Sequence, residues 1–229
     1  MLDMFLTDKS SLSLVNPIDP NDPEQYPADL TIICGSLRVD AHSHVLCENS
    51  SYFKVVCKGG FLEEQTQELK LPADEEFLIR RLLCCRYTTG YNDEPYDDEK
   101  TPPPHIKAPA YVSRLHLNAQ MYSTGDKYDM PSLKEKAAEK FDATIREVHS
   151  HQKMNPGIGP SLVDEIMEAI PHIYSSTPDT DRRLRDRVVQ VACHKRKEFK
   201  NHRGLHDLRA AAPEFFEEHG VRFLSSPWN

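Results

Sequence analysis

Strand-forming patterns are confined to the first third of this 229-residue chain, and later hydrophobic patterns have the spacing of helices. Residues 30–34 and 37–39 are short runs rich in β-branched residues, and the turn signal Gly35-Ser36 between them predicts a hairpin. Residues 68–71 alternate like a further strand that stops at Pro72. This order of patterns predicts an α+β domain followed by an all-α region.

Helix start and stop signals follow the strands. Ser50 or Ser51 can cap a short helix over residues 52–58, and Gly59-Gly60 can end it. A stronger helix is expected from Asp74 to a stop at Gly90.

The all-α part has its own signals. Ser161 with Asp164 forms a capping-box pattern, and Pro171 is expected to kink or end the helix that follows. Thr177-Pro178 predicts the start of the next helix.

Two stretches lack regular patterns. Residues 1–25 hold prolines among Asn and Asp, which predicts a flexible segment, although residues 11–15 alternate weakly like a short strand. Residues 91–110 combine acidic side chains with five prolines and are expected to form an exposed, mobile loop. We therefore expect a folded domain over residues 26–145 and a helical domain over residues 146–229.

Composition narrows the class of protein. The chain is 28% charged, with a formal net charge of −8, which argues against a surface built throughout to bind phosphate backbones. No run approaches the roughly 18 to 20 apolar residues of a membrane helix, and the first residues do not resemble a secretory signal. We expect an intracellular protein, cytoplasmic or nuclear, that does not enter a membrane. Its six cysteines show no C-x-x-C spacing and are expected to be buried free thiols.

Histidine is the first candidate for chemistry, but its spacing does not favour a site. His42 and His44, followed by Cys47, come nearest to a metal cluster, yet residues two apart point to different faces. The sequence contains no nucleophile elbow, phosphate-binding loop or dinucleotide glycine pattern. We therefore expect no catalytic residues, no metal and no cofactor.

Residues 182–203 are strongly basic, with nine Lys or Arg against two carboxylates. One interpretation is a nucleic-acid or nuclear-import patch made by Arg182, Arg183, Lys195, Arg196 and Lys197. The other is the solvated face of an amphipathic helix whose buried side carries Leu184, Val188 and Val191. The second interpretation is the simpler one, and nucleic acid is not the expected partner.

An ordered set of motifs resembles the BTB/POZ family. Residues 29–32 are similar to its first core strand, residues 39–46 (VDAHSHVL) to its strand-to-helix junction, and residues 50–53 (SSYF) to the next helix start. The similarity continues through residues 58–64 and resumes at residues 126–133 (DKYDMPSL). The layout is most similar to filamentous-fungal BTB proteins with a helical C-terminal half.

The resemblance implies a protein–protein interaction module rather than an enzyme. Corepressor-recruiting members commonly place a cation after the His of the junction, where this chain has Ser43, and no zinc fingers or Kelch repeats follow. Repressor and Kelch-adaptor roles are therefore poorly supported. The competing functions are an oligomerisation scaffold or adaptor, with a cullin-family ubiquitin ligase as a candidate partner, and a nuclear, nucleic-acid-associated regulator using the basic helix.

The resemblance also implies two contact sites. BTB adaptors contact cullins through a hydrophobic-x-Glu pattern after the second short helix, which Phe61, Leu62 and Glu63 match. The alternative is that Phe61 packs into its own domain. Family members often form homodimers by exchanging an N-terminal strand, for which Leu12, Leu14 and Val15 are the candidate contacts.

Overall fold

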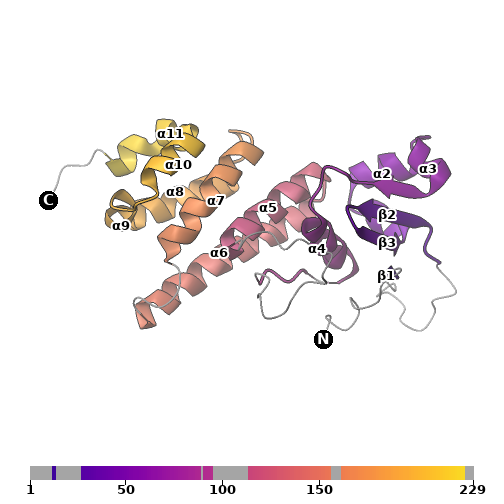
Figure 1. Cartoon of the computed structure of the whole chain (residues 1–229), viewed down its shortest axis with the longest axis horizontal. Coiled ribbons are helices and arrows are strands. Elements are labelled where there is room, and N and C mark those ends of the chain that lie inside the picture. Colours follow the sequence, from indigo (N-terminus) through magenta and orange to yellow (C-terminus); the bar gives the residue numbers. More distant parts are fainter. Residues whose placement is uncertain (1–11, 14–26, 89, 95–112, 156–160, 225–229) are drawn as a thin grey trace. The chain divides into compact units, whose positions relative to one another are not determined.

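The computed structural model describes residues 12–13, 27–88, 90–94, 113–155 and 161–224 (Figure 1). Its strands are β1 (Leu12–Ser13), β2 (Leu30–Cys34), β3 (Leu37–Ala41) and β4 (Glu68–Lys70). Its helices are α1 (Ser43–Cys47), α2 (Ser51–Lys58), α3 (Leu62–Thr66), α4 (Glu76–Tyr87), α5 (Arg114–Lys127), α6 (Pro131–Met154), α7 (Leu162–Ser176), α8 (Arg182–His194), α9 (Arg196–Lys200), α10 (Leu205–Ala211) and α11 (Pro213–Leu224). The order of elements is the predicted α+β part followed by helices alone.

The described residues form two compact units. The first contains the sheet, α1 to α4, and residues 124–135, where α5 ends and α6 begins. The second contains residues 113–123 and the chain from residue 136 onward. The domain boundary expected between residues 145 and 146 falls inside α6 and stays a prediction.

The sheet of the first unit has the strand order β1-β3-β2-β4. β2 and β3 form the predicted antiparallel hairpin, in which Ile32 pairs with Val39. Gly35 takes a φ of +57° in the connecting turn, a conformation that glycine adopts without steric cost. β4 runs parallel to β2, and β1 runs parallel to β3 with Leu12 opposite Val39.

Short helices close the core of this first unit. Alternate residues of β2 and β3 are buried, together with Leu46 of α1, Phe53 of α2, and Ile79 and Leu82 of α4. Tyr128, from the turn between α5 and α6, is fully buried and stacks on Phe53, with ring centroids 5.4 Å apart. This aromatic pair fixes α2 against the α5–α6 turn.

The start of the acidic, proline-rich segment differs from the expectation of an exposed loop. Tyr91 and Asp93 are each only 5% exposed. The buried guanidinium of Arg81 donates hydrogen bonds to the carbonyl oxygens of Asn92, at 2.8 Å, and Glu94, at 3.4 Å. The expectation of exposure is therefore wrong for Tyr91 and Asp93, whereas Asn92 and Glu94, whose carbonyl oxygens Arg81 binds, are exposed. Residues 95–110 lie outside the described residues, as does most of the segment 1–25.

The second unit is built from α7 to α11 with parts of α5 and α6. The Ser161 hydroxyl accepts a hydrogen bond from the Asp164 backbone N–H at 3.0 Å, and the Asp164 carboxylate accepts one from Ser161 N–H at 2.9 Å. This confirms the predicted capping box. Pro171 does not end α7, which continues to Ser176.

The predicted start of the next helix at Thr177-Pro178 is wrong. Thr177 instead follows the end of α7, and its hydroxyl donates to the Ile173 carbonyl oxygen at 2.6 Å. Asp181 caps α8, since its side chain accepts from Arg183 N–H. Two capping signals lie four residues apart, and the tertiary structure uses the second one.

Candidate protein-binding site

The segment that carries Phe61, Leu62 and Glu63 is shaped by caps at the ends of two short helices. The Ser50 hydroxyl accepts a hydrogen bond from Phe53 N–H at 3.1 Å, which confirms the predicted start of α2. Gly60 has a φ of +77°, and its N–H donates to the Glu64 carboxylate at 2.7 Å. The chain therefore turns sharply after α2, and Phe61 stands at the N-cap position of α3.

Phe61 lies on the surface. Its side chain is 52% exposed, and the adjacent Leu62 is 69% exposed. A Cβ atom on Gly59 would lie 2.8 Å from the Phe61 ring, so the ring rests directly over the Gly59 backbone. Phe61 therefore does not fill the core of its own domain, and its position is compatible with a partner contact.

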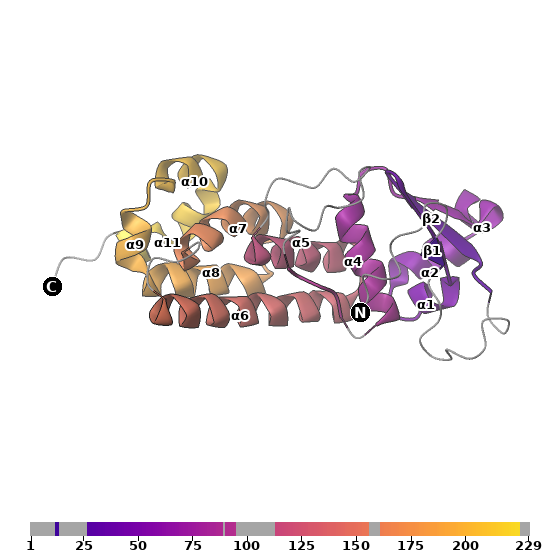
Figure 2. The same ribbon diagram turned by 60° about the horizontal axis from the view of Figure 1, so that its bottom comes forward.

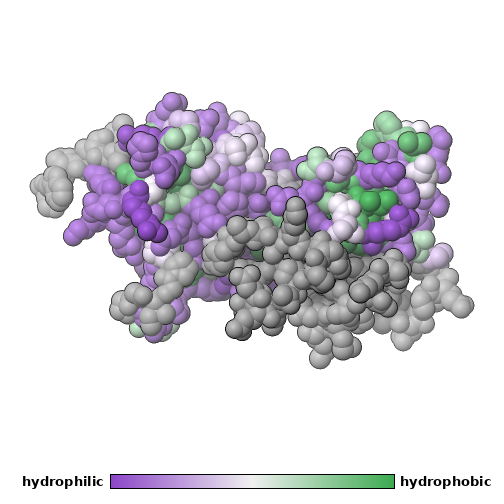
Figure 3. Space-filling view, viewed as in Figure 1, coloured by the Kyte–Doolittle hydropathy of each residue, from purple (hydrophilic) through white to green (hydrophobic). Residues whose placement is uncertain are grey.

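A surface groove begins at Phe61. Its walls come from α2, from the start of α3 and from the α5–α6 turn, and it is lined by Ser51, Tyr52, Val55, Val56, Phe61, Glu63, Lys127 and Asp129. Val55 is 54% exposed. Figure 3 shows hydrophobic side chains gathered on the surface over α2 and α3. We call Val55, Phe61 and Leu62 the apolar patch.

Polar contacts hold the far wall of the groove in place. The Lys127 ammonium lies 2.6 Å from the Asp74 carboxylate and 5.5 Å from the centroid of the Tyr128 ring. The Ser51 hydroxyl donates to the Asp129 carboxylate, and Asp129 has a φ of +46°. Glu63, by contrast, makes no hydrogen bond or ion pair with another described residue. Its carboxylate is the anionic group of the groove that is available to a partner.

Some members of this site could not be identified from sequence patterns. Val55 belongs to an ordinary amphipathic run, and nothing local marks it as exposed. Lys127 and Asp129 lie more than sixty residues from α3 along the chain, and only the packing of Tyr128 on Phe53 brings them to the groove. The DKYDM motif contains Lys127 and Asp129, but it indicated only the family resemblance and not that these residues line a groove.

The position after the His of the strand-to-helix junction has a clear structural role. Ser43 N–H and the Ser43 hydroxyl each donate to the Asp29 carboxylate at 2.6 Å. The Asp29 carboxylate is thus bound by Ser43, the first residue of α1. In corepressor-recruiting members the position of Ser43 commonly carries a cation.

The candidate dimer contacts are only partly described. Leu12 belongs to β1, whereas Leu14 and Val15 lie outside the described residues. The structure therefore brings one of the three into the sheet, beside β3.

The basic segment is largely neutralised by its own unit. At least five of its nine cations form ion pairs with carboxylates, namely Arg182, Arg183, Arg185, Arg187 and Lys195. Asp142 of α6 pairs with both Arg183, at 3.1 Å, and Arg187, at 2.7 Å, where α6 and α8 run side by side (Figure 2). Leu184, Val188 and Val191 are buried, as the amphipathic interpretation requires. This arrangement favours that interpretation over a phosphate-binding surface.

In the described ranges, no three side chains of the metal-binding types come together. All six cysteines are free thiols, but only Cys34 and Cys47 are fully buried, so the expectation of burial is wrong for the other four. None of the described helices combines the length and apolar character needed to cross a bilayer.

The small sheet-and-helix unit that carries the apolar patch has a counterpart among known protein-interaction domains. A family model of the BTB/POZ domain matches residues 21–102. The chain therefore carries a BTB/POZ domain, followed by an all-helical C-terminal region. Comparison with curated proteins gives no match. The likeness to filamentous-fungal members stays a prediction.

Proposed function

We propose that the chain is an adaptor whose BTB/POZ domain binds a cullin-family ubiquitin-ligase scaffold through Phe61, Leu62 and Glu63. The observation that supports this is the exposure of Phe61 at the edge of an apolar groove, beside the Glu63 carboxylate. An aromatic side chain that is buried in a partner's pocket carries much of the binding free energy of an interface, and surrounding polar contacts set its orientation. In this proposal the helical region contacts the client protein.

The decisive experiment compares Phe61→Ala with the unmutated chain in direct binding to purified cullin N-terminal domains. We expect the substitution to weaken binding by about 30-fold or more, which corresponds to about 2 kcal/mol. The melting temperature should hardly change, because truncation of an exposed side chain usually alters stability by no more than about 0.5 kcal/mol. Calorimetric titration and thermal unfolding measure the two effects.

Met154→Ala is the matched control, since Met154 is also an exposed apolar side chain but belongs to the second unit and does not line the groove. It should leave cullin binding unchanged. If Phe61→Ala bound as tightly as the unmutated chain, the anchor would lie elsewhere. If the unmutated chain bound no cullin, the ligase role would be removed and the scaffold role would remain.

We propose further that the chain forms a homodimer by exchange of its N-terminal strand. β1 is only two residues long and sits at the edge of the sheet, paired with β3. The same parallel pairing can be supplied by β1 of a second copy, since exchange of an identical element preserves its hydrogen bonds.

Light scattering should therefore give twice the 26.2 kDa mass of one chain. A variant that lacks residues 1–15 should shift to the monomer mass, because it has lost the exchanged strand. A full-length chain that is monomeric at micromolar concentration and above would contradict the proposal.

A further inference from the structure

Histidine rings lie against one another in both units. The ring centroids are 5.8 Å apart for His42 and His44, 5.5 Å for His116 and His172, and 5.7 Å for His149 and His194. Two imidazoles that share one tetrahedral zinc ion, with Zn–N bonds of about 2.0 to 2.1 Å, have ring centroids roughly 5 Å apart. Each pair is therefore near the spacing that a shared metal ion requires, and the surroundings of the rings distinguish the pairs.

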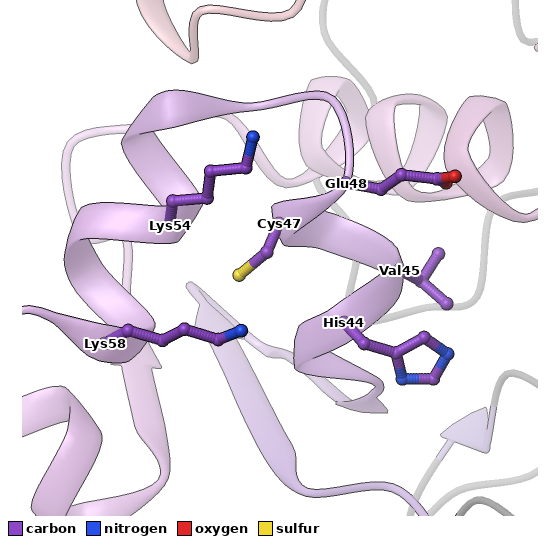
Figure 4. Close-up of a pocket in the computed structure, with 6 residues that line it drawn as sticks. All are labelled: His44, Val45, Cys47, Glu48, Lys54 and Lys58. Atoms are coloured by element: carbon purple, nitrogen blue, oxygen red, sulfur yellow. The ribbon is translucent and has the colours of Figure 1, made fainter.

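The pair in the first unit is poorly placed to bind a cation. His42 is only 5% exposed, and its Nδ1 lies 3.1 Å from the Tyr87 hydroxyl. His44 lines a surface groove that also holds the side chains of Lys54 and Lys58, whose positive charges oppose a metal ion (Figure 4).

The pair formed by His116 and His172 is already engaged by the protein. The Nε2 atom of His172 lies 2.9 Å from the Ser123 hydroxyl, and the Nδ1 atom of His116 lies 3.1 Å from the Glu168 carbonyl oxygen. A metal ion that bound the Nε2 atom of His172 would have to displace its hydrogen bond with Ser123.

His149 and His194 differ from the other pairs because both rings are exposed. Neither imidazole forms a hydrogen bond or an ion pair with another described residue. Each neutral ring therefore has a nitrogen lone pair that is available to a ligand, and imidazole is a preferred ligand of zinc, copper and nickel ions. Lys195, which follows His194, lies 3.0 Å from the Glu198 carboxylate, so its charge is partly offset.

The packing of α6 along α8 brings these two rings together (Figure 2). Asp142 of α6 binds Arg187 of α8, with 2.7 Å between the carboxylate oxygen and Nε. His149 follows Asp142 by seven positions, and His194 follows Arg187 by seven, so each lies about two helical turns further along the same face. The rings are therefore held at one level by two packed helices, although forty-five positions separate them in the sequence.

We propose that His149 and His194 bind one divalent transition-metal ion, with zinc as the representative ion and water in its remaining coordination positions. Small rotations of the two exposed side chains bring the ring centroids from 5.7 Å to the spacing of a shared ion. The bound ion links α6 to α8 and thereby stabilises the second unit, because it binds the folded arrangement of the two helices.

The first test titrates the full chain with zinc chloride and follows the ring nitrogens of its histidines by NMR. The signals of His149 and His194 should shift together and before those of the other histidines, and the shift should saturate at one ion per chain. Magnesium chloride should leave them unchanged, because magnesium prefers oxygen ligands. If zinc shifted other histidines first, or shifted none, the proposal would be overturned.

Single variants test whether both rings hold the same ion. His149→Asn and His194→Asn should each weaken zinc binding at this site about tenfold or more, because the second ligand no longer acts at a high effective concentration. His151→Asn is the matched control, since His151 is also exposed and lies on α6. Zinc affinity in His149→Asn or His194→Asn equal to that in His151→Asn would contradict the shared site.

Hydrogen exchange tests the link between the helices in the unmutated chain. At a free zinc concentration ten times the dissociation constant, protection of the α6 and α8 amides that exchange by opening of this unit should rise about tenfold. The α2 amides of the first unit should not respond, and His149→Asn should lose the effect. Unchanged protection of α6 and α8 in the unmutated chain would show that no ion joins them.

Discussion

Replacing Arg185 by alanine is expected to destabilise the helical unit by about 3 kcal/mol or more. The Arg185 side chain is only 3% exposed and lies within 3.0 Å of carboxylate oxygens of Asp179 and Glu218. Its guanidinium also donates to the Thr177 carbonyl oxygen at 2.6 Å and stands 4.5 Å above the centroid of the Tyr174 ring. Its removal would leave the carbonyl oxygens of Tyr174 and Thr177 without this buried donor, although Glu218 keeps its ion pair with Arg182. Loss of one partner from a buried charge network costs about 3 to 5 kcal/mol.

Hydrogen exchange of the amides in α7 and α8 measures this effect directly, because it reports the stability of one unit of a chain that has two. Arg187→Ala is the matched control on the same helix. Arg187 pairs with Asp142 but keeps 29% of its side chain exposed, so its loss should cost less than about 1 kcal/mol. Equal protection of the α7 and α8 amides in Arg185→Ala and in the unmutated chain would show that the network does not stabilise this unit.

Replacing Phe53 by alanine should destabilise the BTB/POZ unit by about 3 to 5 kcal/mol. The Phe53 ring is 1% exposed and stacks on the buried Tyr128 ring at an interplanar angle of 5°. Truncation would remove this contact and leave a cavity, and both the lost burial and the cavity lower stability.

The control for Phe53 is Val55→Ala, two residues further along α2. Val55 is more than half exposed, so its truncation should change stability by no more than about 0.5 kcal/mol. Exchange of the α2 and α4 amides compares the two variants. If Phe53→Ala were as stable as Val55→Ala, the aromatic pair would not be the element that holds α2 in the fold.

Local signals predicted the elements that depend on local chemistry. The β2–β3 hairpin, the Ser50 cap and the Ser161 capping box each rest on residues within a few positions of one another, and the structure has all three. Thr177 failed as a cap signal for a physical reason, since its hydroxyl binds the last turn of α7 and leaves Asp181 to cap α8. The burial of Tyr91 and Asp93 could not be predicted either, because the segment is held by the buried Arg81 ten or more residues away.

The candidate binding site, too, could be predicted only in part from local sequence patterns. The hydrophobic-x-Glu pattern located Phe61 and Glu63, but a sequence pattern does not distinguish an aromatic side chain in a core from one on a surface. The path of the chain decides this, through the positive φ of Gly60 and the close approach of the Phe61 ring to Gly59. The wall made by Lys127 and Asp129 depends on a contact across more than sixty residues, for which a single sequence gives no direct signal.

The two walls of the groove at Phe61 come from parts of the chain that are translated at different times. The ribosome releases α2 and α3 first, whereas Lys127, Tyr128 and Asp129 emerge only after the whole intervening stretch has been translated. A nascent chain that carries Phe61 therefore presents it without its opposite wall. The complete groove exists only once the DKYDM turn has folded back onto α2, so the domain must be finished before it can engage a partner there.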